Sequence, residues 1–202
     1  MYSTMPNLVL AFHGCDKNTY DDILHCNGKL HKSTHEYDWL GNGMYFWEQN
    51  LERAWNWAEE AAANPKRKVK VPAVIGAVID MGYCLNLLDS RSIKLLKNQY
   101  EMFELKMSLS NKEIPLNKDV GDNTDLLLRY LDCAVIEELH TERESQGLKA
   151  FDTVRGLFHE GEQIYNTSGF FEKTHIQICV RNPNCIKGFF APREIDENWS
   201  IV

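Results

Sequence analysis

Apolar residues recur along the chain in runs and stripes that predict alternating strands and helices. Unbroken or alternating apolar runs are typical of buried and half-buried strands, and they predict strands over 7–13, 44–48, 71–81, 154–158, 163–165, 174–180 and 185–192. Apolar stripes at helical spacing predict helices over 19–27, 51–63, 90–107 and 125–140. This order of elements predicts an α+β fold with a mixed or antiparallel sheet core and flanking helices.

Polar residues and a glycine mark the expected helix ends. Asn18 or Thr19 is expected to cap the first helix, and Gly28 to end it in the left-handed conformation. Asn50 is expected to cap the second helix, and Ser90 the third.

We expect a single domain over residues 1–202 that carries one insertion. From about 108 to 149 the sequence becomes polar, with Pro115 and Gly121 and one stripe of helical spacing. We interpret this segment as a mostly helical insertion, which either recognises a target or covers the functional site.

Charge and cysteine usage narrow the class of protein. The 22 basic and 29 acidic residues give a formal net charge of -7, which argues against a nucleic-acid binder driven by bulk positive charge. The six cysteines form no Cys-x-x-Cys pair and no zinc-type spacing, so we expect reduced thiols, no metal site and a cytoplasmic protein. Residues 1–10 lack a secretion signal, and no apolar run approaches the roughly 18 residues of a membrane span, so no membrane partner is expected. Export by a specialised system would leave no such mark.

Two features bring chemistry to predicted strand ends. His13 and Gly14 follow a buried strand, where the imidazole can hydrogen-bond a ligand hydroxyl and the glycine lets the backbone approach a planar amide. Gly41 and Gly43 precede an aromatic strand, whose Tyr45 offers a face on which a planar, partly charged ring can stack. A histidine at a strand end is also common as a purely structural residue.

A third feature lies in the late strand. Gln177 alternates with apolar neighbours and shares a face with His175 and Cys179, so its amide must be hydrogen-bonded or lie in a cleft. The helix after the aromatic strand returns Trp57 to the same neighbourhood. Three other aromatic residues there are expected in the core: Phe46, Trp47 and Trp55.

In this order, the segments resemble the poly-ADP-ribose polymerase branch of the ADP-ribosyltransferases. The resemblance is carried by FHG (12–14), by GNGMYF (41–46) before a helix with Arg53 and Ala54, and by QICVRNPNCI (177–186). It spans about 8–107 and 155–192 and excludes the insertion. The stretch 33–48 is most similar to bacterial single-domain relatives, which act as toxins or defence effectors.

The resemblance implies an ADP-ribosyltransferase fold with a split, mixed or antiparallel sheet, and it implies NAD as the substrate. His13 would bond ribose hydroxyls, Gly14 would pair its backbone with the nicotinamide amide, and Tyr45 would stack on the nicotinamide ring. Four further residues are expected along NAD, the first two on its adenosine side: Ser33, Asp38, Gly43 and Trp57.

Gln177 departs from the family, which normally has a catalytic Glu at this position. That carboxylate bonds the ribose and stabilises the charge that develops as nicotinamide leaves, whereas a neutral amide can only orient the ribose. Chain elongation is therefore not expected. On the acceptor side, Glu160, Glu162 and Glu172 are either candidate general bases or solvated loop carboxylates. Arg155 is a candidate phosphate or substrate contact, or one half of a surface salt bridge.

These residues predict an NAD-dependent mono-ADP-ribosyltransferase in which His13, Tyr45 and Gln177 are catalytic. The acceptor would be a protein side chain or a nucleic-acid base, and a bacterial setting would imply a neutralising, antitoxin-type partner. Two alternatives stay open. One is a catalytically silent module that binds NAD or ADP-ribose, and the other is an enzyme that hydrolyses NAD.

Overall fold

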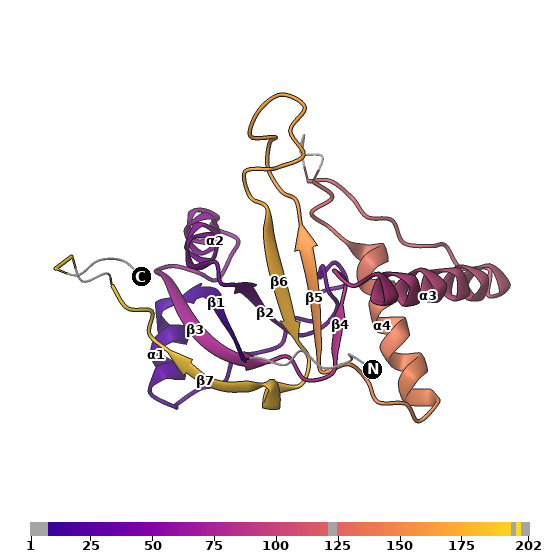
Figure 1. Cartoon of the computed structure of the whole chain (residues 1–202), viewed down its shortest axis with the longest axis horizontal. Helices are drawn as coiled ribbons and strands as arrows, with labels where there is room; N and C mark the ends of the chain where they lie inside the picture. The colour runs from indigo at the N-terminus through magenta and orange to yellow at the C-terminus, as the bar shows by residue number, and fades with distance from the viewer. Residues whose placement is uncertain (1–7, 121–124, 195–196, 199–202) are drawn as a thin grey trace.

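A seven-stranded mixed sheet and four α-helices make up the part of the chain that the computed structural model describes, residues 8–120, 125–194 and 197–198 (Figure 1). The strands are β1 (Leu8–Asp16), β2 (Met44–Glu48), β3 (Pro72–Asp80), β4 (Cys84–Asn86), β5 (Thr153–Phe158), β6 (His175–Val180) and β7 (Ile186–Phe190). The helices are α1 (Lys17–Leu24), α2 (Leu51–Ala63), α3 (Ser90–Leu109) and α4 (Tyr130–Ser145), and a short 3-10 turn, η1 (Pro183–Cys185), precedes β7. The expected mixture of helices and a mixed sheet is confirmed.

The sheet divides between β2 and β1. The strand order is β4-β5-β6-β2-β1-β3-β7, and only β4 and β5 run parallel. β1 pairs with β3 along its whole length but with β2 only at Ala11↔Glu48 and Phe12↔Trp47. Beyond Phe12, β1 continues with β3, while β2 pairs with β6 instead. The two halves of the sheet therefore share only a short seam.

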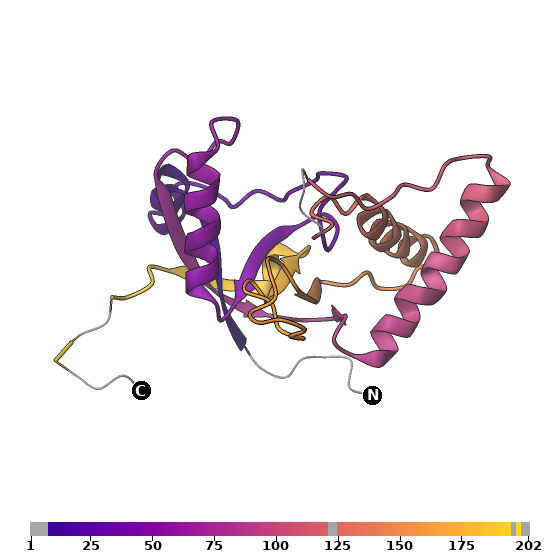
Figure 2. The same ribbon diagram turned by 90° about the horizontal axis from the view of Figure 1, so that it is seen from above.

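Helices cover both faces of the sheet. Val74 and Ile75 are neighbours in β3, so their side chains point to opposite faces. Val74 packs with Ala54 of α2, and Ile75 packs with Ile23 of α1. We call the face that carries Trp47 and Gln177 the α2 face, and the face that carries Phe46 and Ile178 the α1 face. Figure 2 shows α2 and the α3–α4 pair at opposite ends of the sheet.

Helix α4 is part of the core. Its Ile136 and Leu139 pack with Val154 of β5 and Cys179 of β6 on the α2 face. The segment 108–149 thus buries apolar side chains against the central strands, as a core helix does. The helix spans Tyr130–Ser145, so the predicted bounds of 125–140 are wrong at both ends. In its first turn Asn117 accepts hydrogen bonds from the backbone amides of Leu131 and Asp132, over 2.9 and 3.3 Å.

The predicted N-cap of the second helix is confirmed. The predicted N-caps of the first and third helices are wrong, and so is the residue predicted to end the first helix. Asn50 caps α2 by accepting from the Arg53 amide over 2.9 Å. The cap of α1 is Asp16, which accepts from the Asn18 amide, and the cap of α3 is Asp89. Past α1 the left-handed residue is Cys26, with φ of 57°, and Gly28 does not adopt that conformation.

Other expectations also need correction. The first strand does not close at His13 but runs on to Asp16, because β3 still pairs with it there. Residues 163–165 form no strand; only an isolated bridge joins Gln163 to Phe171. Trp55 is 40% exposed and lies outside the core, whereas Phe46 and Trp47 are buried as expected.

None of the helices in the described ranges is both long enough and apolar enough to cross a membrane.

Candidate functional site

His13 bridges the two halves of the sheet. It lies one residue beyond the last β1–β2 pair, and its Nδ1 donates a hydrogen bond to the backbone carbonyl of Tyr45 over 2.7 Å. Burial lowers the pKa of His13 more than this bond raises it, so the ring is neutral and Nε2 keeps its lone pair. Within the described ranges Nε2 has no hydrogen-bond partner. It can therefore accept from a ligand hydroxyl.

The hydroxyl of Tyr45 is hydrogen-bonded within the turn before β2. The hydroxyl donates to the Gly41 carbonyl over 2.6 Å and accepts from the Leu40 amide over 2.8 Å. Burial raises the pKa of Tyr45 well above its usual range, so the phenol stays neutral. The ring lies beside the core cluster that contains Ile136 and Cys179. What Tyr45 offers a ligand is therefore ring surface and not its hydroxyl.

Gln177 is oriented by His175. The Nδ1 of His175 donates to the Lys173 carbonyl over 2.6 Å, and burial lowers the pKa of this ring, so its Nε2 carries a lone pair. The side-chain amide nitrogen of Gln177 lies 3.2 Å from that Nε2 and donates to it. This contact identifies the nitrogen end of the amide. The carbonyl oxygen of Gln177 is left to accept a hydrogen bond.

The structure brings the three predicted catalytic residues onto neighbouring strands but not into mutual side-chain contact. Tyr45 pairs with Cys179 and Trp47 with Gln177, so Tyr45 and Gln177 share the α2 face. The His13 ring packs against Phe46, with 5.6 Å between ring centroids, on the α1 face. His13 therefore reaches Tyr45 only through the backbone. The face shared by His175, Gln177 and Cys179 is confirmed.

Gly14 and Gly43 both stand where another part of the chain approaches closely. A Cβ on Gly14 would lie 2.5 Å from the Ala54 carbonyl oxygen, so α2 rests directly on β1. A Cβ on Gly43 would lie 2.4 Å from Cys179 Sγ. Packing alone requires both glycines, whatever the site binds.

The turn before β2 is tied to α4. Glu137 of α4 accepts from the backbone and side-chain nitrogens of Asn42 over 2.8 and 3.0 Å, and it pairs with Arg181. Burial alone would raise the pKa of Glu137, but the bonds from Arg181 and Asn42 outweigh it and lower that pKa. The residues that flank Tyr45 are thus fixed by a segment that the sequence pattern indicated to be an insertion.

The other predicted NAD-binding residues lie in different surroundings. Ser33 forms two backbone hydrogen bonds with Gly43, of 2.8 and 3.1 Å, and so lies at the same turn. Asp38 accepts from the His35 amide, and burial raises its pKa against the hydrogen bonds that it accepts. Trp57 packs on Trp47 with 5.8 Å between ring centroids. Trp57 thus belongs to α2 and contacts Trp47, and among the described residues its ring is not in contact with that of Tyr45.

Two of the four candidate acceptor-side residues, Glu160 and Arg155, are held in ion pairs. Glu160 is bound by Nη2 of Arg53 over 2.9 and 2.8 Å. Arg155 holds Glu48 with two hydrogen bonds of 2.6 and 2.7 Å in a pair that is largely buried, so it forms a salt bridge, though not one at the surface. Arg155 pairs with Ile178 and so lies on the α1 face, away from Gln177. The remaining acids are exposed: Glu162 and Glu172.

Comparison with known proteins gives one relative. The chain is 30% identical over 193 residues to MJ0359, an uncharacterized protein of Methanocaldococcus jannaschii, and the match covers 87% of this chain and 83% of the archaeal protein. This chain belongs to the MJ0359 family. No protein-family model matches the chain. No solved structure matches it either.

In this MJ0359-family chain, Trp47 stands beside Gln177 and Arg53 stands beside Trp47, and the sequence did not predict either as a site residue. Trp47 is the cross-strand partner of Gln177, and the guanidinium carbon of Arg53 lies 5.8 Å from the Trp47 ring centroid. The available signals were the period of two that gives Tyr45 and Trp47 one face, and a lone Arg on the apolar stripe of α2. His175, known only as a neighbour of Gln177, also emerges as the residue that orients it.

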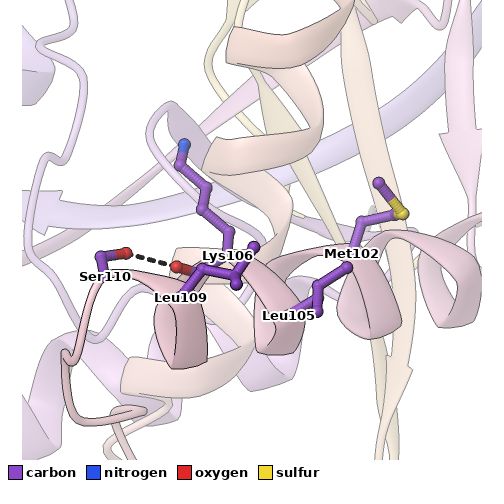
Figure 3. A pocket seen from close by; sticks show the side chains of 5 residues that line it. All are labelled: Met102, Leu105, Lys106, Leu109 and Ser110. Atoms are coloured by element: carbon purple, nitrogen blue, oxygen red, sulfur yellow. Dashed lines mark hydrogen bonds between the residues drawn. The ribbon is translucent and has the colours of Figure 1, made fainter.

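The described residues were also compared with the requirements of metal, thiol and pocket sites. No group of three or more potential metal ligands occurs in the described ranges. Burial raises the pKa of the Cys179 thiol to about 12 and those of three further thiols, Cys15, Cys84 and Cys133, to about 11, which makes them poor nucleophiles. The shallow hollow in Figure 3 lies on α3 and is lined by Met102, Leu105, Lys106, Leu109 and Ser110, none of which belongs to the predicted site.

Proposed function

We propose that this chain is an NAD-dependent mono-ADP-ribosyltransferase with an ADP-ribosyltransferase fold. One observation carries the proposal. His13, Tyr45 and Gln177 come from three distant segments that resemble that family in order, and their strands β1, β2 and β6 are neighbours at the point where the sheet parts. Because His13 lies on the α1 face and Gln177 on the α2 face, a ligand that contacts both would enter the gap where β1 and β2 separate.

The chain's own groups suit the ribose next to nicotinamide. The Nε2 of His13 accepts from a ribose hydroxyl, since its Nδ1 is committed to the Tyr45 carbonyl. The carbonyl oxygen of Gln177 accepts from another, since the amide nitrogen is committed to His175. The Tyr45 ring offers the face for nicotinamide. Transfer breaks the bond between the ribose carbon and nicotinamide, which leaves with the bonding pair, and joins that carbon to an acceptor whose proton passes to a base.

A second candidate is favoured by the charges at the site. Gln177 is neutral, and the carboxylates of Glu160 and Glu48 are each held by an arginine. An oxocarbenium-like transition state therefore gains little electrostatic stabilisation from these groups. If the chain is an enzyme, its transfer is expected to be slow. If it is not, it is a silent module that binds NAD or ADP-ribose.

The decisive experiment incubates the full chain with NAD labelled in the adenylate, alone and with cell protein or RNA. Nicotinamide release and labelled macromolecules are followed together. Labelled protein or RNA supports transfer, and nicotinamide without label supports hydrolysis. Binding without either product supports the silent module, and absence of NAD binding refutes the proposal. The Gln177→Leu variant should lose the activity, whereas Gln146→Leu, at an exposed position after α4, should keep it.

A further inference from the structure

Arg53 presents buried donors beside Trp47, the cross-strand partner of Gln177. It lies in the first turn of α2, and its side chain is only 6% exposed. Its Nη2 binds both carboxylate oxygens of Glu160, but its Nε and Nη1 have no hydrogen-bond partner. The buried indole Nε1 of Trp47, on which the guanidinium packs, has none either. Most of the buried side-chain nitrogens without a hydrogen-bond partner in the described ranges therefore belong to these two contacting residues.

Such donors are costly unless something accepts from them. A buried donor without a partner costs roughly 1–3 kcal/mol, and native structures contain few of them. The N–H groups of Nε and Nη1 lie on different edges of the guanidinium, so a single carbonyl oxygen cannot satisfy them. A group with several oxygens around one centre and negative charge fits the planar fork best, which is the chemistry of phosphate.

We propose that Arg53 and Trp47 form a subsite for the diphosphate of the dinucleotide, and that Glu160 is the internal carboxylate which this diphosphate displaces from Nη2. The inference rests on the proposed function and extends it, because it names the group that Arg53 holds. Trp47 is the cross-strand partner of Gln177, so the subsite adjoins the residue that faces the ribose. In NAD, the diphosphate is bonded to that ribose.

The displacement has a structural basis. Glu160 belongs to the segment between β5 and β6, whereas Arg53 is held by α2, whose first turn is capped by Asn50. Glu160 lies two residues beyond the end of β5, next to Gly161, whose φ is 83°. The Glu160 carbonyl accepts from the Lys173 amide over 2.9 Å, so the backbone of this segment is held, and the carboxylate withdraws by rotation of its own side chain while Arg53 and Trp47 stay in position.

The test measures binding to the full chain by calorimetry with three probes: inorganic pyrophosphate, ADP-ribose and adenosine. Arg53→Lys keeps the charge but loses the fork, so pyrophosphate and ADP-ribose should bind about 10- to 100-fold more weakly, with adenosine unchanged. Trp47→Phe should cost about 2- to 10-fold for the same two probes. Glu160→Gln should tighten both about fivefold or more, because it removes the competing charge.

Matched controls are Arg91→Lys and Trp55→Phe, which change an exposed Arg and an exposed Trp. Unchanged pyrophosphate and ADP-ribose binding in Arg53→Lys and Trp47→Phe overturns the inference, and so does an equal loss for adenosine. Weaker ADP-ribose binding with intact pyrophosphate binding also overturns it. Should Arg53→Lys fail to fold, the opposite signs expected for Trp47→Phe and Glu160→Gln still decide.

The two proposals fail in different ways. Arg53-dependent binding of ADP-ribose without any NAD turnover or transfer would support the subsite and refute the transferase. NAD turnover with diphosphate binding that ignores Arg53 would do the reverse.

Discussion

The imidazole of His13 lies 2.7 Å from the carbonyl oxygen of Tyr45, and this hydrogen bond joins β1 to β2 where their backbone pairing has ended. A side chain thus takes over the role of a ladder bond. Its consequence is a fixed tautomer, because the carbonyl can only accept, so Nδ1 carries the proton and Nε2 does not. The two residues are therefore coupled through the backbone of one and the side chain of the other.

Tyr45→Phe should destabilise the protein, although phenylalanine keeps the aromatic ring at the site. The substitution leaves the Leu40 amide without its acceptor and leaves the Gly41 carbonyl with only the Cys179 thiol as donor, which costs about 1–3 kcal/mol. Urea unfolding of the variant measures this loss. An alanine at the same position would also remove core packing, so it cannot separate binding from folding. If Tyr45→Phe unfolds like the wild type, the hydroxyl does not hold the turn.

Gln177→Glu should raise NAD turnover by about 10- to 100-fold, because a carboxylate stabilises the positive charge that develops on the ribose. It should also raise the pKa of His175, whose Nε2 faces this side chain and must then carry a proton. Nicotinamide release and proton NMR of the imidazole measure the two effects. Gln146→Glu, with the same charge change at an exposed position, should show neither. A raised His175 pKa with unchanged turnover would favour the silent module.

Gly43→Ala should cost about 1–3 kcal/mol of unfolding free energy, because the added Cβ would lie 2.4 Å from Cys179 Sγ. Cys179→Ala in the same chain should return part of that loss, although the Val180 carbonyl at 2.8 Å still crowds the new methyl. Denaturant unfolding of the two single variants and the double variant gives the coupling. Gly188→Ala is the control, since no atom lies within 4 Å of its Cβ position. Additive effects at 43 and 179 would contradict the predicted clash.

The sequence predicts those elements whose causes are local. Helix α2 is an example, because Asn50, the apolar stripe and Pro65 all lie within or beside it. The face of Gln177 is another, because strand alternation needs only its neighbours. The start of α4 was missed because its N-cap, Arg129, makes no side-chain capping bond, and the acceptor for its first turn is Asn117, well before the helix. Arg53 was missed because its partner Glu160 lies 107 residues away and only the fold brings them together.

Acid should destabilise the fold from about pH 6.5 downward, because burial lowers the pKa of His13, His140 and His175. With the folded pKa below the unfolded value of 6.5, the unfolded chain takes up protons first. The stability that the neutral rings contribute is therefore full above about pH 6.5 and is lost as the pH falls toward the lowered values. The free energy of unfolding in urea at pH 7.5 and 5.5 measures this slope.

His140→Phe should flatten that slope, because it removes the most buried of these rings, which is 1% exposed and packs edge-on against Phe151. The cost at pH 7.5 should be modest, since phenylalanine keeps the aromatic contact and leaves only the Ile136 carbonyl without its side-chain partner. His31→Gln, at an exposed position, should keep the wild-type slope. A slope that is identical in wild type and His140→Phe would mean that buried His140 does not contribute to acid unfolding, and that His13 and His175 account for the slope instead.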